Sequence, residues 1–215
     1  MRQPIFSTDF TQADGAPSSP WVNSGWNGST GALQVLSNRL RSNAAISTEI
    51  PMSVIDTVLP RNQYLEFSLP TFSVGAGVTI YAIGVLRIVA APTQTYIRIW
   101  CASVAGVTRF DLSTIVSGGA ENFFDSTTLT LAAGDRVRFE AVDNRIRLYR
   151  NGTHVYTSIA NNDVLGDGRV GISFYYTAGA QSDAEVDNLE LGICNLAKPS
   201  GVVSRPRPFA PGLAR

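Results

Sequence analysis

The most constraining feature of the chain is a run of alternating polar and apolar residues between positions 136 and 156. Residues 136–142 read Arg-Val-Arg-Phe-Glu-Ala-Val, and residues 145–150 read Arg-Ile-Arg-Leu-Tyr-Arg. A period of two places successive side chains on opposite faces of a β-strand. An Asp-Asn pair divides the two segments, and the Asn-Gly pair at 151–152 is the strongest short signal for a β-hairpin. We therefore expect three consecutive antiparallel strands here.

Other segments extend the β pattern along the chain. Residues 63–69 alternate Tyr, Glu and Ser with Leu, Phe and Leu, which predicts a strand with one wet face. Residues 78–89 are almost continuously aliphatic and contain Gly84, which indicates a central strand covered on both faces. The strand expected at 96–101 should form a hairpin with it. Further strands are expected at the two segments 169–176 and 184–191.

Length and composition favour one domain of this kind. The chain has 215 residues, 19 Gly and 11 Pro, and only 16% of its residues are charged. Many short strands joined by tight turns explain this composition better than amphipathic helices do. We divide the chain into an N-terminal segment (1–6), a β-sandwich (7–196) and an extended proline- and arginine-rich arm (197–215), and expect no membrane-spanning segment because no run approaches about 20 apolar residues.

The order of the motifs resembles a known fold family. Gly-Asp-Arg-Val-Arg-Phe-Glu (134–140), the hairpin 146–156, Gly-Arg-Val-Gly-Ile-Ser-Phe (168–174) and Ala-Glu-Val-Asp-Asn-Leu-Glu-Leu (184–191) follow one another as in concanavalin A-like and laminin G-like jelly-roll domains. The similarity spans most of residues 7–193. It implies an all-β sandwich of two curved antiparallel sheets, with a concave face that often receives glycans or proteins. Members include lectins, adhesion modules, glycoside hydrolases and virion proteins, so the fold does not specify an activity.

One acidic pattern resembles a catalytic motif of glycosidases with this fold. Glu185, Asp187 and Glu190 follow the acid-x-acid-x-x-acid spacing, and a retaining glycosidase needs two carboxyl groups about 5–5.5 Å apart. The pattern lies on what we expect to be the final strand, and no sugar-stacking residues surround it. We therefore favour a structural role, in which the Asp accepts hydrogen bonds from backbone donors at the sheet margin, and assign no catalytic residue.

Metal and nucleophile chemistry has little support in the sequence. His154 is the only histidine and follows the hairpin turn, so we expect a solvated or cross-strand residue rather than a metal ligand or a triad base. Cys101 and Cys194 are interpreted as buried free thiols, with a single bridge as the alternative. Residues 161–163 and Asp167 could supply calcium ligands, although Asn and Asp are also the residues that turns require. We expect no cofactor and assign no metal site.

The aromatic residues offer a glycan-binding alternative. Trp21, Trp26, Trp100, Tyr175 and Tyr176 could stack on sugar rings if they reach a concave face. Core packing is the favoured role for most of them, because aromatic side chains dominate sandwich interiors. Trp26 is flanked by turn residues, so it is the aromatic side chain that we expect to be exposed and to contact a glycan.

The C-terminal arm is chemically distinct from the sandwich. It carries four positive charges and no negative ones after residue 197, and because the whole chain is formally neutral, the remaining body has a net charge of about −4. Four prolines favour an extended conformation and remove backbone donors. The residues expected to contact a partner are Arg205, Arg207, Phe209, Leu213 and Arg215. The final eight residues are similar to the tails of phage structural proteins.

These observations lead to one functional hypothesis and two alternatives. We expect a non-enzymatic bacteriophage virion protein, made in the host cytoplasm and built into the capsid surface or tail. Its arm would dock onto a major capsid or tail protein and onto copies of itself. The alternatives are a module that binds a host-surface glycan and, third, a glycoside hydrolase. Nucleic-acid binding is not expected, because four tail cations beside a negative body give a small electrostatic footprint.

Overall fold

A computed structural model describes residues 2–23, 33–42, 52–73, 79–89, 94–159, 164, 166–178 and 184–195. Within these ranges no helix is long and apolar enough to cross a membrane. The strands are β1 (Arg2–Thr8), β2 (Trp21–Asn23), β3 (Leu33–Leu36), β4 (Arg39–Ser42), β5 (Met52–Ile55), β6 (Gln63–Phe72), β7 (Thr79–Val89), β8 (Thr95–Val104), β9 (Val107–Ile115), β10 (Asn122–Thr128), β11 (Arg136–Val142), β12 (Arg145–Arg150), β13 (Thr153–Ile159), β14 (Arg169–Ala178) and β15 (Ala184–Cys194).

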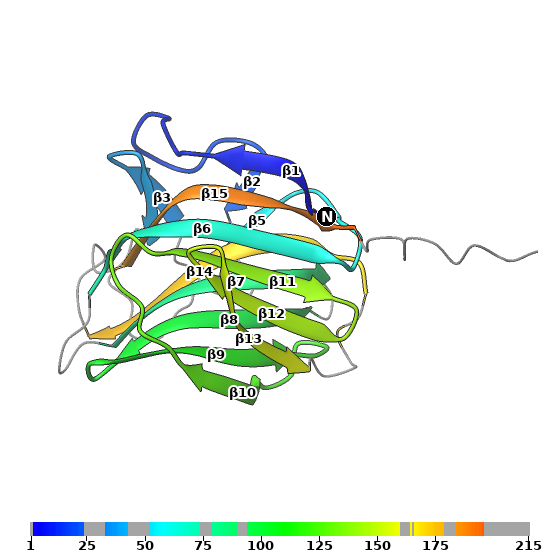
Figure 1. The fold of residues 1–215 in the computed structure, drawn as a ribbon. Coiled ribbons are helices and arrows are strands. Elements are labelled where there is room, and N and C mark those ends of the chain that lie inside the picture. Colours follow the sequence, from blue (N-terminus) through cyan, green and yellow to red (C-terminus); the bar gives the residue numbers. More distant parts are fainter. Residues whose placement is uncertain are drawn as a thin grey trace, which may run out of the picture.

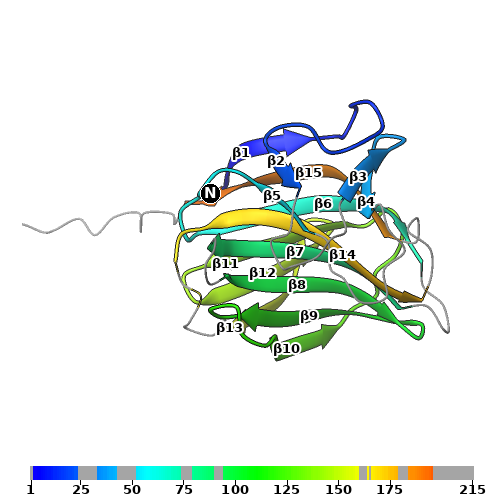
Figure 2. The ribbon, with the colours of Figure 1, turned by 180° about the vertical axis from the view of Figure 1, so that it is seen from behind.

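The strands form two antiparallel sheets packed face to face, as in a jelly roll (Figure 1). The eight-stranded sheet has the order β13-β12-β11-β6-β15-β4-β3, and β1 pairs with β15 beside β4. The seven-stranded sheet has the order β10-β9-β8-β7-β14-β5-β2 and faces the viewer in Figure 2. The expected all-β, two-sheet antiparallel sandwich is therefore confirmed.

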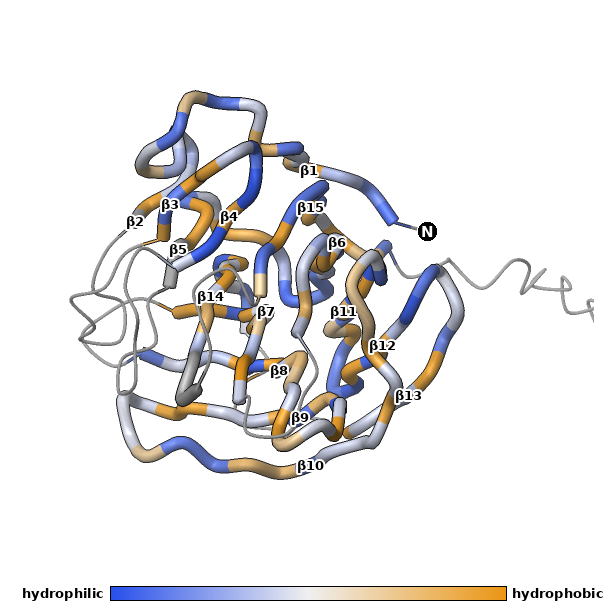
Figure 3. The backbone as a smooth tube through the Cα atoms, turned by 90° about the vertical axis from the view of Figure 1, so that its left-hand side faces the viewer, coloured by the Kyte–Doolittle hydropathy of each residue, from blue (hydrophilic) through white to orange (hydrophobic). Residues whose placement is uncertain are grey.

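The inward side chains of the two sheets form one apolar core. In Figure 3, seen from one end, hydrophobic and hydrophilic positions alternate along the strands of both layers. Phe139 of β11 meets Phe67 and Phe110 edge to face, with ring centroids 5.6 and 5.7 Å apart. Gly84 of β7 makes room for this cluster, because a Cβ there would lie 2.5 Å from the Phe139 ring. Gly84 is thus a packing requirement of the central strand.

The predictions of hairpins and of buried free cysteines, which rest on local sequence patterns, are confirmed. Strands β11, β12 and β13 pair consecutively, and the turn between the last two places Asn151 and Gly152 at φ of 49° and 79°. These left-handed angles are those that Asn-Gly accommodates well. Strands β7 and β8 form the expected hairpin, and most side chains of β7 are buried. Cys101 and Cys194 are buried free thiols, and burial raises the pKa of the Cys194 thiol to about 12.

Two predictions need correction. The boundary at residue 7 placed residues 2–6 outside the sandwich, but they form most of β1, whose Arg2 is in register with Cys194 of β15. The wet face predicted for 63–69 is also wrong, since Tyr64 and Glu66 are buried. Arg2 covers both: it contacts Glu66 at 2.5 Å and lies over the Tyr64 ring. Because β1 pairs with β15, Arg2 covers residues of β6 that the sequence alternation alone predicts to be exposed.

Candidate functional site

A groove of about 890 Å³ lies on the outer face of the seven-stranded sheet. Its floor follows from strand alternation: Ile99 and Cys101 of β8 point into the core, so Trp100 between them points outward. The same alternation brings Asp111 of β9 opposite Trp100, where the two residues are partners in the strand register. The residues lining the groove are Tyr81, Trp100, Arg109, Asp111, Glu121, Phe123, Asp125, Ser126 and Tyr175.

Four aromatic rings from four strands form the apolar part of the groove. Trp100 is central, with ring centroids 5.0 Å from Tyr81, 5.8 Å from Phe123 and 6.2 Å from Tyr175. Trp100 is only 5% exposed, whereas Phe123 is 57% exposed. Burial raises the pKa of the Tyr81 phenol, so it remains a neutral hydrogen-bond donor. The other three rings form a fixed apolar surface, and the exposed ring of Phe123 beside them is accessible to a ligand.

A buried polar network holds this apolar surface in place. The Trp100 indole donates a hydrogen bond to Ser113 Oγ at 2.9 Å, and Ser113 in turn donates to the Glu121 carboxylate. The other oxygen of Glu121 pairs with Arg98 at 3.2 Å. Arg98 is 3% exposed, and its guanidinium lies over the rings of Tyr96 and Trp100. Glu121 therefore links the groove rim to a buried cation that lies beside Trp100 on the same face of β8.

The other two carboxylates of the groove also accept hydrogen bonds from protein side chains. Asp111 accepts a hydrogen bond from Arg109 at 2.8 Å, and Arg109 remains 40% exposed. Asp125 accepts hydrogen bonds from Tyr156 at 2.9 Å and from Ser158, both on β13 of the opposite sheet. A register shift in β10 lies between Phe123 and Asp125, and both residues line the groove. Phe123 is largely exposed there, whereas Asp125 also fastens β10 to β13.

Several residues selected from the sequence lie outside the residues that the structure describes. These are Trp26, the loop 161–163, and the arm residues Arg205, Arg207, Phe209, Leu213 and Arg215. The side chain of Tyr176 also lies outside what the structure describes, and the remaining aromatic candidates divide between two places. Trp21 packs in the core against Phe6 and Phe10, as favoured above, whereas Trp100 and Tyr175 line the groove.

The acidic pattern of β15 lies on the other sheet, away from the groove. Glu185 pairs with Arg39 at 2.8 Å and accepts a hydrogen bond from Thr71. Glu190 accepts a hydrogen bond from Tyr64, and Asp187 accepts one from the backbone N–H of Asn188. These contacts hold strand margins together, in keeping with the structural interpretation.

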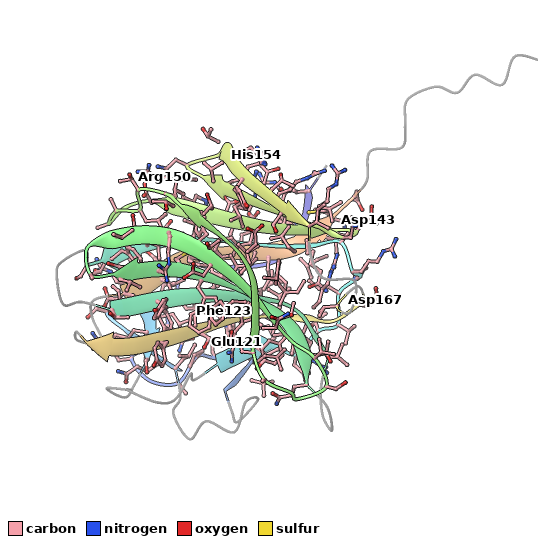
Figure 4. All side chains as sticks on the ribbon, turned by 90° about the horizontal axis from the view of Figure 1, so that it is seen from below. Glu121, Phe123, Asp143, Arg150, His154 and Asp167 are labelled. Carbon is pink, nitrogen blue, oxygen red and sulfur yellow. The ribbon has the colours of Figure 1, made fainter. Side chains whose placement is uncertain are left out.

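His154 also lies apart from the groove. It is exposed on β13, its ring meets Tyr149 edge to face, and its Nε2 lies 2.8 Å from Thr157 Oγ1. Figure 4 labels Glu121 and Phe123 beside each other and His154 on the opposite side of the molecule. Asp167 accepts a hydrogen bond from the backbone N–H of Arg61, and no group of three potential metal-binding side chains occurs in the described part of the chain.

Sequence reasoning missed two thirds of the groove because it assigned nothing between residues 102 and 128. Six of the nine lining residues come from this stretch: Arg109, Asp111, Glu121, Phe123, Asp125 and Ser126. A signal was present: β9 alternates Arg, Asp and Ser with Phe and Leu directly after an Ala-Gly turn. That pattern predicts a strand with a polar outer face.

Comparisons with solved structures agree with the fold. A β-glucanase from Bacillus licheniformis superposes with a TM-score of 0.58 at 12% identity, covering 88% of this chain and 98% of the other. The carbohydrate-binding module CBM66 from Bacillus subtilis gives 0.53 at 13%, covering 80% and 94%. A Bacillus subtilis protein of unknown function with a galectin-like fold gives 0.59 at 8%, covering 90% and 98%.

Searches of protein-family models and of curated protein sequences find no match. At these identities the structural similarity establishes the fold alone. The chain is a two-sheet antiparallel β-sandwich whose structural neighbours are glycan-binding and glycosidase jelly rolls.

Proposed function

We propose that the protein binds carbohydrate through the groove of the seven-stranded sheet. The observation that carries this proposal is the 57% exposed ring of Phe123, held against the fixed aromatic floor and bordered by Arg109, Asp111 and Ser126. Aromatic faces stack on the apolar faces of sugar rings, while such polar groups hydrogen-bond to hydroxyls. The neighbouring β-glucanase and CBM66, which by name act on or bind carbohydrate, support the same ligand class.

The proposal is for binding without hydrolysis. A glycosidase needs one carboxylic acid free to protonate the leaving oxygen and a second carboxylate as nucleophile or base. In the groove Glu121 is paired with Arg98, Asp111 with Arg109, and Asp125 holds hydroxyl groups of β13. On β15, Glu185 and Glu190 have partners too. Each carboxylate thus has a structural role that catalysis would disrupt.

Replacing Phe123 tests the glycan proposal. Phe123→Ala is expected to weaken sugar binding at least about tenfold, because it removes the exposed stacking face and leaves the floor intact. Ile159→Ala is the matched control, since Ile159 is an exposed apolar side chain, at 70%, on β13 of the other sheet. A glycan array identifies the sugar, and titration calorimetry measures the affinity of each variant.

Two outcomes would contradict this proposal. If the folded wild-type protein binds no glycan on the array, carbohydrate binding is excluded. If Phe123→Ala and Ile159→Ala lower the sugar affinity equally, the groove is not the binding site. Release of reducing sugar from a bound β-glucan by the wild-type protein would overturn the non-catalytic part alone.

A role in virion assembly is a second proposal, favoured by the charge difference between arm and body. The arm carries +4 and the body about −4. The sandwich would be displayed on a capsid or tail, with the arm contacting the structural proteins beneath it and copies of this chain. The arm residues lie outside the described ranges, so this proposal is supported by the sequence only.

Deleting residues 198–215 tests the assembly proposal. The shortened protein is expected to remain folded, because β15 ends at Cys194, and to be lost from purified particles. Immunoblotting of particles assembled with each form measures incorporation. Equal incorporation of the shortened protein would exclude the arm as the attachment segment.

A further inference from the structure

The groove has chemical features that suit a second ligand, one that this chain itself carries. Arm residues 205–209 read Arg-Pro-Arg-Pro-Phe, a proline-rich sequence with two guanidinium groups and one aromatic ring. Proline-rich segments favour the polyproline II conformation, and protein modules recognise them in grooves lined by aromatic side chains. Recognition of this kind has a low entropic cost because the ligand is already extended.

The groove has the aromatic lining that binding of a proline-rich segment requires. The rings of Tyr81, Trp100 and Tyr175 lie within 5.0–6.2 Å of one another, and Phe123 extends the apolar surface toward solvent. Proline rings pack well between such flat side chains. Arginine guanidinium groups also stack on aromatic faces, as Arg98 does on Tyr96 and Trp100 of the same sheet face. The groove therefore offers both contacts that an Arg-Pro repeat needs.

The charges of the groove select for a cationic ligand. Three carboxylates line it, of which Glu121 is paired with Arg98 and Asp111 with Arg109, so Asp125 leaves the groove with a net negative charge. The hydrogen-bond donors to the Asp125 side chain among the described residues are two hydroxyl groups and the Ser126 N–H, so its negative charge has no cationic partner there. An acidic peptide or sugar would be repelled, whereas an arginine is attracted.

The length of the arm permits this contact. The last described residue is Asn195, and residues 205–209 follow it by 10 to 14 positions, which allows a span of at most roughly 33–50 Å. A domain of this size has a radius of gyration of roughly 16 Å. Residues 205–209 can therefore reach a groove on the same molecule or on a neighbouring copy.

We propose that the arm, through residues 205–209, occupies the groove of the seven-stranded sheet. The arginines face Asp111 and Asp125, and the prolines and Phe209 pack against the aromatic rings. The arm and a carbohydrate then compete for one surface. The inference goes beyond the proposed function, since the groove would bind the arm whether or not a sugar ligand exists.

A peptide titration tests the proposal. The receptor is the protein ending at Asn195, which keeps every strand that the structure describes, and the probe is a synthetic peptide of residues 198–215. Micromolar binding that weakens as salt rises is expected, because charge pairs near the surface are screened. Phe123→Ala should weaken it at least about tenfold, whereas Ile159→Ala should leave it unchanged. A peptide with Arg205→Ala and Arg207→Ala should lose a similar factor.

The full-length chain gives an independent measurement. Substituting Arg205, Arg207 and Phe209 together by Ala should strengthen sugar binding, because the competing segment is removed. Sedimentation shows where the arm binds: a wild-type oligomer that the triple variant abolishes indicates a neighbouring copy, and a monomer throughout indicates the same chain. Both results fit the proposal when the peptide binds the groove.

The outcomes separate this proposal from carbohydrate binding. A peptide that does not bind, or binds Phe123→Ala as well as wild type, overturns arm docking and leaves sugar binding standing. Peptide binding in a protein that binds no glycan supports arm docking and removes the proposed function.

Discussion

Arg87→Met is expected to lower the free energy of unfolding by about 3–5 kcal/mol, because a buried acceptor that loses its donor costs about 1–3 kcal/mol and three acceptors are affected. Arg87 is fully buried, and its guanidinium donates to the backbone carbonyls of Arg61, Val164 and Asp143 at 2.8, 2.8 and 2.5 Å. These carbonyls belong to three separate connections between strands. The thioether of Met fills a similar volume without a donor, so all three carbonyls lose their partner.

Arg61→Met is the matched control for this prediction. Arg61 pairs with Asp143 at 3.0 Å, but the two side chains are 55% and 46% exposed. Exposed ion pairs contribute about 0–1 kcal/mol, and the backbone carbonyl that Arg87 uses is retained. Urea unfolding of both variants measures the difference. A loss for Arg87→Met no larger than that for Arg61→Met would show that the buried guanidinium does not hold these connections together.

Local sequence signals predicted the strands whose partners are adjacent in the chain. The hairpin β12–β13 follows from Asn151-Gly152, because these two residues accept the left-handed angles that a tight turn needs. The strand containing Gly84 was recognised from its aliphatic composition. In each case the information lies within about a dozen consecutive residues. The fold class and three of the thirteen pairings between described strands, namely β7–β8, β11–β12 and β12–β13, could therefore be predicted before any long-range contact was known.

Features that depend on distant pairing could not be predicted in this way. Glu66 alternates with apolar neighbours as a wet-face residue does, yet Arg2 and Arg136, 64 and 70 positions away, cover it. The groove depends on the same kind of information. Trp100 and Asp111 become neighbours only through the register of β8 with β9, and Tyr175 reaches them across β7. Sequence reasoning grouped Trp100 and Tyr175 with three other aromatic residues as possible sugar contacts, but it had no means of showing that these two share a surface that Trp21 does not reach.

The β15 acidic pattern shows the limit of composition as a guide. Its residue types and spacing suit glycoside hydrolysis, although a structural role is favoured for it. Glu185 has that type, but Arg39 and Thr71 occupy its oxygens. Phe123 carries no motif, yet its exposure beside Trp100 gives it the stronger argument for contacting a ligand. Which side chains are free to bind is thus a property of their partners rather than of their spacing.

Glu121→Ala is expected to combine a loss of stability of about 3–5 kcal/mol with loss of ligand binding, because it leaves the buried Arg98 without its carboxylate. Among the described residues Arg98 then keeps a 3.2 Å contact with the Tyr96 hydroxyl and the two aromatic faces. Ser113 loses its acceptor as well, so the hydroxyl oxygen that accepts from the Trp100 indole is no longer held in one orientation. Unfolding of the variant in urea and titration with peptide 198–215 measure the two effects.

A double-mutant cycle separates the charge from the packing. If the cost of Glu121→Ala comes from an unpaired buried cation, then Arg98→Met in the same chain should recover part of the stability, since no buried charge remains. Ligand binding should not recover, because Ser113 still lacks its acceptor and the apolar surface beside Phe123 stays loose. Additive losses in the double variant would mean that Arg98 and Glu121 act independently. Restored ligand binding in the double variant would instead show that the Glu121 carboxylate is not needed to orient Trp100.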